Sequence, residues 1–208
     1  MLRKFWGNTF IRGGAIFTIA SFFTSFINYL FNLLSARALG PSGFGEITTL
    51  FSYATIFSVP TVVVSLVIIG KIGSRGKNAS SYSLGILRWF LSRLKYWSWL
   101  GVLVIFIIPF VPKITNLSVI TGYFLIPLVL FTFIGAFYAA LLQGLQLFTW
   151  FSIISILAVS LKLFGAVLVT LGIDGLLTIV FFLFLSFFIP LILSHKLITK
   201  HLLKSAHS

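Results

Sequence analysis

The sequence predicts an all-α, polytopic membrane protein with six transmembrane helices. Of its 208 residues, 59% are hydrophobic and only 8% are charged, and the mean hydropathy is +1.15. Soluble domains average about 25% charged residues, so this chain has too little polar material to cover a water-exposed surface. Long uncharged runs recur along it, of the ~20 residues that a helix needs to cross a bilayer. We therefore expect a single membrane domain over residues 1–208.

Uncharged runs define the expected spans. The runs 13–36 and 47–70 predict the first two helices, and the shorter run 96–112 predicts a third. The run 114–161 is long enough for two crossings, with the break expected at Gln143-Gly144-Leu145-Gln146. A sixth helix follows in the next uncharged run. The expected spans are 12–36, 46–70, 96–112, 119–142, 148–171 and 175–194.

The loop 71–95 between the second and third expected spans is basic and partly amphipathic. Leu84, Leu87, Leu91 and Leu94 recur at helical spacing, among Arg, Lys and Trp side chains. This pattern predicts either a helix lying in the membrane interface or an early start of the third span.

Positive charge is distributed unevenly between the two expected faces of the membrane. Arg37 and Lys113 would share one face with the only two acidic residues, Glu46 and Asp174. Almost all the remaining cations of this +13 chain precede the first span, fill the loop 71–95 or follow the sixth span. Because cytoplasmic loops are enriched in Lys and Arg, we expect both termini in the cytoplasm. The cations are spread between apolar spans, so nucleic acid is not an expected partner.

Lys162 is the exceptional cation, because it falls near the middle of the fifth expected span. A Lys at the bilayer centre costs about 2.5–3.5 kcal/mol on insertion scales, and such residues usually face the interior of a helix bundle. One interpretation is a fixed positive charge in a water-filled cavity, ready for an anionic group. The other is a side chain that extends to the membrane interface.

A polar stripe runs along the first expected span. Its members follow each other at intervals of three or four residues, so they share one helix face: Thr18, Ser21, Ser25, Asn28, Asn32 and Ser35. The second span has similarly spaced polar residues: Thr48, Ser52, Thr55 and Ser58. Polar groups that face lipid without a hydrogen-bond partner raise the free energy of the folded protein. The stripe therefore predicts either hydrogen bonds between helices or the lining of a cavity. Asn28, Asn32 and Ser25 are candidate ligand contacts.

Prolines within the expected spans are candidate gating positions. Pro60 lies in the second span and Pro127 in the fourth, and proline removes a helical hydrogen bond and favours a kink. Static kinks are the alternative.

Catalysis is not expected. The chain has no Cys, two carboxylates and three His confined to its last residues, so acid–base or metal chemistry has no cluster of groups to work with. A membrane-embedded transferase is therefore disfavoured. We expect no enzymatic activity, no metal and no cofactor.

Two segments resemble a known family. The segment LSARALGPSGFGEITTLFSYATIF, residues 34–57, contains the pattern Ala-Arg-x-Leu-Gly-Pro-x-x-Phe-Gly, formed by Ala36, Arg37, Leu39, Gly40, Pro41, Phe44 and Gly45. It resembles the signature between the first two helices of polysaccharide-biosynthesis (O-antigen-type) flippases, in the multidrug/oligosaccharidyl-lipid/polysaccharide exporter superfamily. Residues 141–175, which include Gln143-Gly144, are similar to the fourth-loop-to-fifth-helix segment of the same family.

The resemblance implies the N-terminal half of such a flippase, one lobe of a MATE-like fold in a bacterial or archaeal cytoplasmic membrane. The implied activity is translocation of lipid-linked oligosaccharide carried on a polyprenyl diphosphate, in a cationic cavity between two lobes. Lys162 and Arg37 are then candidate diphosphate contacts. The implied partners are this substrate, membrane lipids, and a second lobe or a second copy. A non-transporting scaffold in envelope polysaccharide synthesis and half of a small-molecule exporter remain as alternatives.

The motif itself predicts a tight external hairpin. Gly40, Pro41 and Gly45 are turn-forming residues between two apolar runs. Arg37 and Glu46 flank the turn and are expected to be able to pair across it.

Overall fold

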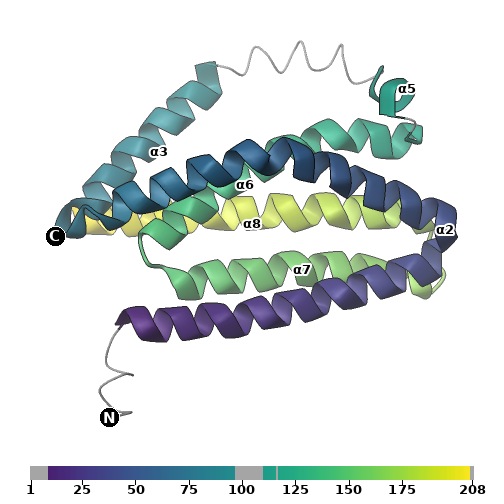
Figure 1. The fold of residues 1–208 in the computed structure, drawn as a ribbon, viewed down its shortest axis with the longest axis horizontal. Helices are drawn as coiled ribbons and strands as arrows, with labels where there is room; N and C mark the ends of the chain where they lie inside the picture. The colour runs from purple at the N-terminus through teal and green to yellow at the C-terminus, as the bar shows by residue number, and fades with distance from the viewer. Residues whose placement is uncertain (1–8, 97–109, 116, 207–208) are drawn as a thin grey trace.

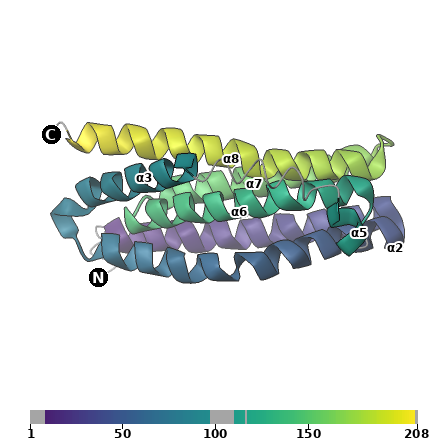
Figure 2. The same cartoon turned by 90° about the horizontal axis from the view of Figure 1, so that it is seen from above.

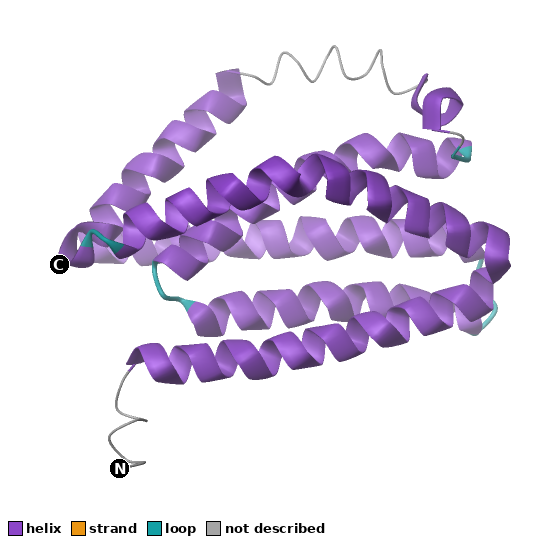
Figure 3. Ribbon diagram, in the orientation of Figure 1, coloured by secondary structure: helices purple, strands orange, loops and turns teal. Residues whose placement is uncertain are grey.

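The computed structural model describes residues 9–96, 110–115 and 117–206, apart from the side chains of a few of them. In these ranges the chain forms helices joined by short turns, with no strand (Figure 3). The elements are α2 (Thr9–Gly73), η1 (Gly76–Asn78), α3 (Ala79–Tyr96), α5 (Val111–Thr115), α6 (Val119–Gly144), α7 (Phe148–Thr170) and α8 (Gly175–Ala206). The all-helical prediction is confirmed for the described residues.

Helix α2 is two helices joined at a sharp bend. Gly40, with φ 67° and ψ −177°, departs from helical geometry, and the chain then turns back toward the end of the bundle where α2 began (Figure 1). We call residues 9–39 the first arm and residues 41–73 the second arm. Only glycine adopts this backbone region readily. One glycine therefore produces the hairpin that the sequence predicts.

The predicted turn was too wide. Pro41 and Gly45 both belong to the second arm, which begins immediately after Gly40. Proline is well tolerated in the first turn of a helix, where a backbone N–H has no helical partner. Glycine clusters predict a loop only statistically, and here Gly45 has an ordinary helical backbone.

Helices α6 and α7 match the predicted fourth and fifth spans closely. The turn between them contains Gln146 at φ 57°, where the break was expected, and Gly172 at φ 94° lies in the next turn. Helix α8 begins at Gly175 as predicted but continues to Ala206. The sixth expected span ended at residue 194 because the uncharged run that defined it stops before Lys196. The helix continues because Ile198 and Leu202 are buried against the rest of the bundle.

Helix α3 confirms that the basic loop contains a helix. Leu87 is buried, Leu84 and Leu91 pack against the same core, and Trp89 is 60% exposed on another face. The third expected span, 96–112, lies mostly on residues 97–109, which are outside the described residues.

Within the described ranges, four helices are long and apolar enough to cross a membrane: α2, α6, α7 and α8. The apolar part of α2 spans 61 residues, which is enough for one crossing by each arm. The arms pack on α6 and α7, and α8 packs on both α6 and α7. Figure 2 shows these helices lying along a common direction in an elongated bundle.

The bundle has a basic end and a far end. Both ends of α2, the α6–α7 turn and the end of α8 lie together, and this basic end includes Lys71, Lys200 and Lys204 (Figure 1). The far end holds the Gly40 bend, α5 and the α7–α8 turn. Both acidic residues, Glu46 and Asp174, belong to the elements at the far end. Both acidic residues are therefore at one end of the bundle, and Lys71, Lys200 and Lys204 are at the other.

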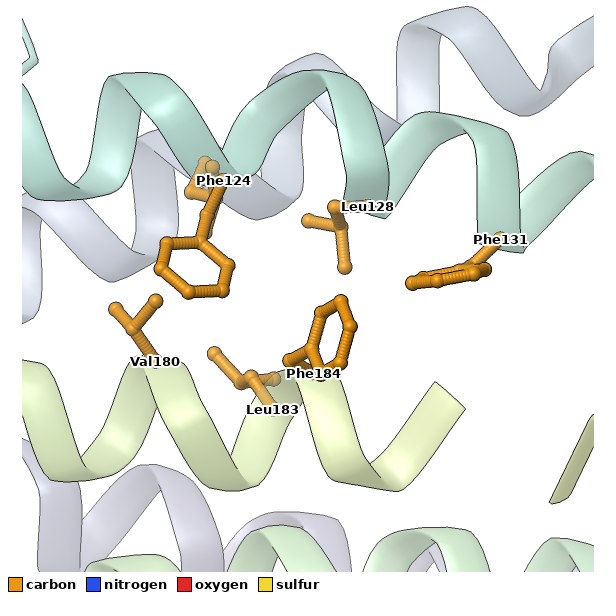
Figure 4. A pocket seen from close by; sticks show the side chains of 7 residues that line it. Phe124, Leu128, Phe131, Val180, Leu183 and Phe184 are labelled. Atoms are coloured by element: carbon orange, nitrogen blue, oxygen red, sulfur yellow. The ribbon is translucent and has the colours of Figure 1, made fainter. Parts of the chain in front are cut away.

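The contact between α6 and α8 is closed and apolar. Phe124, Leu128 and Phe131 of α6 face Val180, Leu183 and Phe184 of α8 (Figure 4). The rings of Phe131 and Phe184 meet edge to face with centroids 5.1 Å apart. The remaining space is about 10 Å³, roughly that of a single water position, so no ligand is accommodated here.

Candidate functional site

Lys162 of α7 is held inside the bundle by Asn28 of the first arm. Its Nζ donates a hydrogen bond to Asn28 Oδ1 over 2.6 Å. The Asn28 amide nitrogen donates in turn to the backbone carbonyl of Thr24 at 2.9 Å. This second bond orients the amide, because it leaves the oxygen of Asn28 facing the ammonium.

Two aromatic rings flank the same ammonium. The Lys162 Nζ lies 5.2 Å from the ring centroid of Phe31 and 5.4 Å from that of Phe51. Both distances are within the range of a cation–π interaction, which is strongest where water is excluded. The two rings also meet edge to face, which fixes their positions. Lys162 therefore has a defined position inside the bundle.

Lys162 and Asn28 line two cavities at once. The outer cavity, of about 750 Å³, lies between the two arms of α2. Its polar lining comprises Asn28, Asn32, Thr48, Ser52, Thr55 and Lys162. The inner cavity, of about 390 Å³, lies between the first arm, α6, α7 and α8, and its lining includes Ser155, Ser186 and Ser194. The Lys162–Asn28 pair is the boundary that these two cavities share.

No carboxylate accompanies the ammonium. Neither cavity is lined by an acidic residue. The two acidic residues of the chain both belong to elements at the far end. Since buried charges are normally paired, the position at Lys162 is suited to an anion supplied from outside the chain.

The polar stripe of the first arm divides into three parts. Asn28 and Asn32 line the outer cavity, whereas Ser35 is fully buried. Ser25 is exposed on the flank of the bundle beside Phe22 and Phe26, in neither of the two cavities. The structure therefore brings Asn28 and Asn32 together with Lys162 and leaves Ser25 apart.

The hydroxyl groups of the two arms mostly bond within their own helix. Thr48, Ser52 and Thr55 each donate to the backbone carbonyl four residues earlier. They do not join helices to one another, and their oxygens remain open to the outer cavity as acceptors. Side-chain bonds between helices that the sequence did not pair include Lys162 with Asn28, and Tyr138 of α6 with His195 of α8 at 2.8 Å.

Arg37 and Glu46 do not pair with each other. Arg37 is exposed near the bend and lines neither cavity. The Oε2 of Glu46 accepts a hydrogen bond from the hydroxyl of Thr121 at 3.1 Å, and Thr121 is fully buried near the start of α6. The predicted flanking pair is therefore replaced by a bond from the second arm to α6. Residues 75 positions apart give no local sequence signal of this contact.

Of the turn and gating candidates Gly40, Pro60 and Pro127, only Gly40 interrupts a helix. The second arm keeps helical geometry through Pro60, and α6 continues through Pro127. Neither proline lines the two cavities. Pro190 of α8, which the sequence did not single out, does line the inner cavity.

Comparison of the chain with family models, with curated proteins and with solved structures finds no match. The resemblance to flippases therefore remains an expectation from the two sequence segments.

Proposed function

We propose that this chain is one lobe of a flippase that moves lipid-linked oligosaccharide, carried on a polyprenyl diphosphate, across the cytoplasmic membrane. The observation that carries the proposal is the Lys162 ammonium, which lies inside the bundle, faces two cavities and has no carboxylate partner. A diphosphate brings the missing negative charge. Lys provides a compact positive charge that suits phosphate oxygens.

The surroundings of Lys162 suit a substrate that is polar at the headgroup and apolar elsewhere. Asn32 and the hydroxyls of Thr48, Ser52 and Thr55 offer hydrogen bonds to sugar or phosphate. Phe31, Phe51 and Ile47 line the same cavity with apolar surface. When a diphosphate binds, the ammonium exchanges its bond with Asn28 for bonds to phosphate oxygens, and Asn28 remains nearby as a neutral partner.

The outer cavity supports the presence of a second lobe or a second copy. Asn32, Thr48, Ser52 and Thr55 are exposed on this side of the bundle. The hydroxyls are satisfied by their own helix, but the amide of Asn32 has no hydrogen-bond partner among the residues that the structure describes. An unpaired amide facing hydrocarbon costs several kcal/mol, which favours a partner that encloses the cavity. Alternating access between two repeats requires such a partner.

A translocation assay tests the proposal. It uses the protein purified from its native membrane together with any partner that accompanies it. The protein is reconstituted into vesicles with a fluorescent diphosphate-linked oligosaccharide, and the rate at which the label reaches the opposite leaflet is measured. We expect wild type to move the label and Lys162→Met to lose at least about tenfold in rate, as for one charged hydrogen bond. Lys196→Met is the matched control, because it removes an equal charge outside both cavities.

Each alternative has its own result in this assay. A non-transporting scaffold gives no translocation by wild type, although the protein is folded. A small-molecule exporter gives no translocation of the lipid but Lys162-dependent movement of a soluble anion. Equal rates for Lys162→Met and Lys196→Met would contradict the role proposed for Lys162.

A further inference from the structure

A third groove lies away from the two cavities of Lys162. It is about 750 Å³ in volume and is formed by the second arm of α2, by α3 and by α6. None of its lining residues is shared with the outer or the inner cavity. Its volume is within the range of about 300–1,000 Å³ that is usual for ligand sites.

Most of this groove is hydrocarbon surface. Val64 and Ile68 line it from the second arm, and Phe133 and Phe137 line it from α6. Phe90 of α3 stacks on Phe137 with ring centroids 3.7 Å apart, which joins α3 to the bundle and closes the floor. The hydroxyls of Thr61 and Ser65 already donate hydrogen bonds to backbone carbonyls, so a ligand in the apolar part of the groove needs no polar group to satisfy them. An acyl chain fits this surface.

Two cations border the same groove without a counter-ion. Lys71 is in the last turn of the second arm and Arg93 is in the last turn of α3, and both side chains line the groove. Neither Glu46 nor Asp174, the only acidic residues of the chain, lines it. The groove therefore combines hydrocarbon surface with an excess of positive charge.

Two of the aromatic residues that line this groove are of the kinds that concentrate near lipid headgroups. Trp89 is exposed and lines the groove, as does Tyr82, whose ring carries the Arg75 guanidinium 4.6 Å above its centroid. Trp and Tyr concentrate where hydrocarbon meets water, and an amphipathic helix such as α3 lies in that zone. Lys71 lies at the basic end of the groove, whereas Arg93 lies near the opposite end of α3.

We propose that this groove binds an anionic phospholipid. One acyl chain lies along Val64, Ile68 and Phe137, and the phosphate of the headgroup lies beside Lys71, with Arg93 farther along α3. The bound lipid fixes α3 against α2 and α6. The site is independent of the flippase proposal, since it shares no residue with the cavities of Lys162.

Native mass spectrometry of the purified full-length chain tests this site, with phosphatidylglycerol as the probe and phosphatidylcholine as the zwitterionic comparison. We expect wild type to retain phosphatidylglycerol preferentially. Charge-neutralising Lys71→Gln with Arg93→Gln is expected to weaken its binding about 30-fold, the combined effect of two cations near an anionic lipid. Lys196→Gln with Lys200→Gln removes the same charge from α8 and is expected to change binding less than threefold.

A second variant tests the acyl-chain part without altering charge. Val64 is 53% exposed within the groove, so Val64→Trp fills the groove while the helix is expected to fold. Circular dichroism and elution volume confirm the fold of each variant. Weaker phosphatidylglycerol binding by Val64→Trp supports the site, and unchanged binding overturns it. Equal losses from the two charge-neutralising pairs would overturn it as well, because they would indicate general attraction to a basic surface. The variant Lys162→Met should bind phosphatidylglycerol like wild type, whatever the outcome for translocation.

Discussion

The ammonium of Lys162 on α7 and the amide oxygen of Asn28 on α2 are 2.6 Å apart, although 134 positions separate the two residues in the chain. This bond connects the first arm to the centre of the bundle. It also lies where the outer and inner cavities meet.

Removing the two partners separately should have different effects on the free energy of unfolding. Asn28→Ala leaves a buried ammonium without its acceptor, and we expect a loss of about 1–3 kcal/mol in the free energy of unfolding. Lys162→Met replaces the charge by an apolar chain of similar length, which is expected to leave stability unchanged or raise it. Reversible unfolding of both variants in mixed detergent micelles measures the difference. If Lys162→Met proved the more destabilised variant, the bond would be a structural requirement and Lys162 would not be retained for function.

The bend at Gly40 should be sensitive to a single methyl group. Neither Gly40 nor Gly45 has a neighbour within 4 Å of an added Cβ, so space is equally available at both. Gly40 has φ 67°, whereas Gly45 is helical. Gly40→Ala is therefore expected to lower the free energy of unfolding by about 1–3 kcal/mol, because the alanine backbone is strained at this φ. Gly45→Ala should stabilise the second arm by up to about 1 kcal/mol. Equal effects of the two substitutions on thermal unfolding would show that the bend does not depend on glycine.

Close packing between α7 and α8 gives a third prediction. A Cβ at Gly165 would lie 2.5 Å from the Cβ of Phe182, closer than atoms can approach. Gly165→Ala must push the two helices apart, and we expect a loss of about 1–3 kcal/mol. Gly135→Ala in α6 is the control, because its added methyl meets nothing within 4 Å. A Gly165→Ala variant as stable as Gly135→Ala would contradict this helix contact.

The orientation of the bundle can be measured on a clean background, because the chain contains no Cys. Asp174→Cys places a thiol at the far end and Lys200→Cys places one near the basic end; both positions are exposed. If the basic end faces the cytoplasm, a membrane-impermeant maleimide should label Asp174→Cys in intact cells. It should label Lys200→Cys only after permeabilisation. The reversed pattern would show that the basic end faces outward.

Local patterns in the sequence predicted most of the fold. The spans of α6 and α7, the hairpin of α2 and the sorting of charge to two ends all follow from where charged and turn-forming residues fall. The end of α8 was missed, because the burial of Ile198 and Leu202 depends on packing against other helices. The exact bend was missed because only one of several glycines adopts a positive φ there.

The site was predicted less completely. Lys162 stands out in any hydropathy plot, and Asn28 belongs to a visible polar stripe. Their mutual bond and the rings of Phe31 and Phe51 were missed, since each depends on contacts between distant segments. Ser25 and Asn28 both belong to the polar stripe, three residues apart, so the sequence does not distinguish them. The packing of α2 on α7 places Asn28 in the cavity and leaves Ser25 exposed.

The most direct test of the central claim is the affinity of the purified chain for undecaprenyl diphosphate relative to undecaprenol, measured by native mass spectrometry. The two lipids share their apolar chain and differ in the anion that Lys162 is proposed to bind. We predict that wild type prefers the diphosphate by about 10- to 100-fold, as expected for charged hydrogen bonds, and that Lys162→Met abolishes most of this preference. Lys162→Arg should retain part of it. A preference that is the same in wild type and in Lys162→Met would contradict the account.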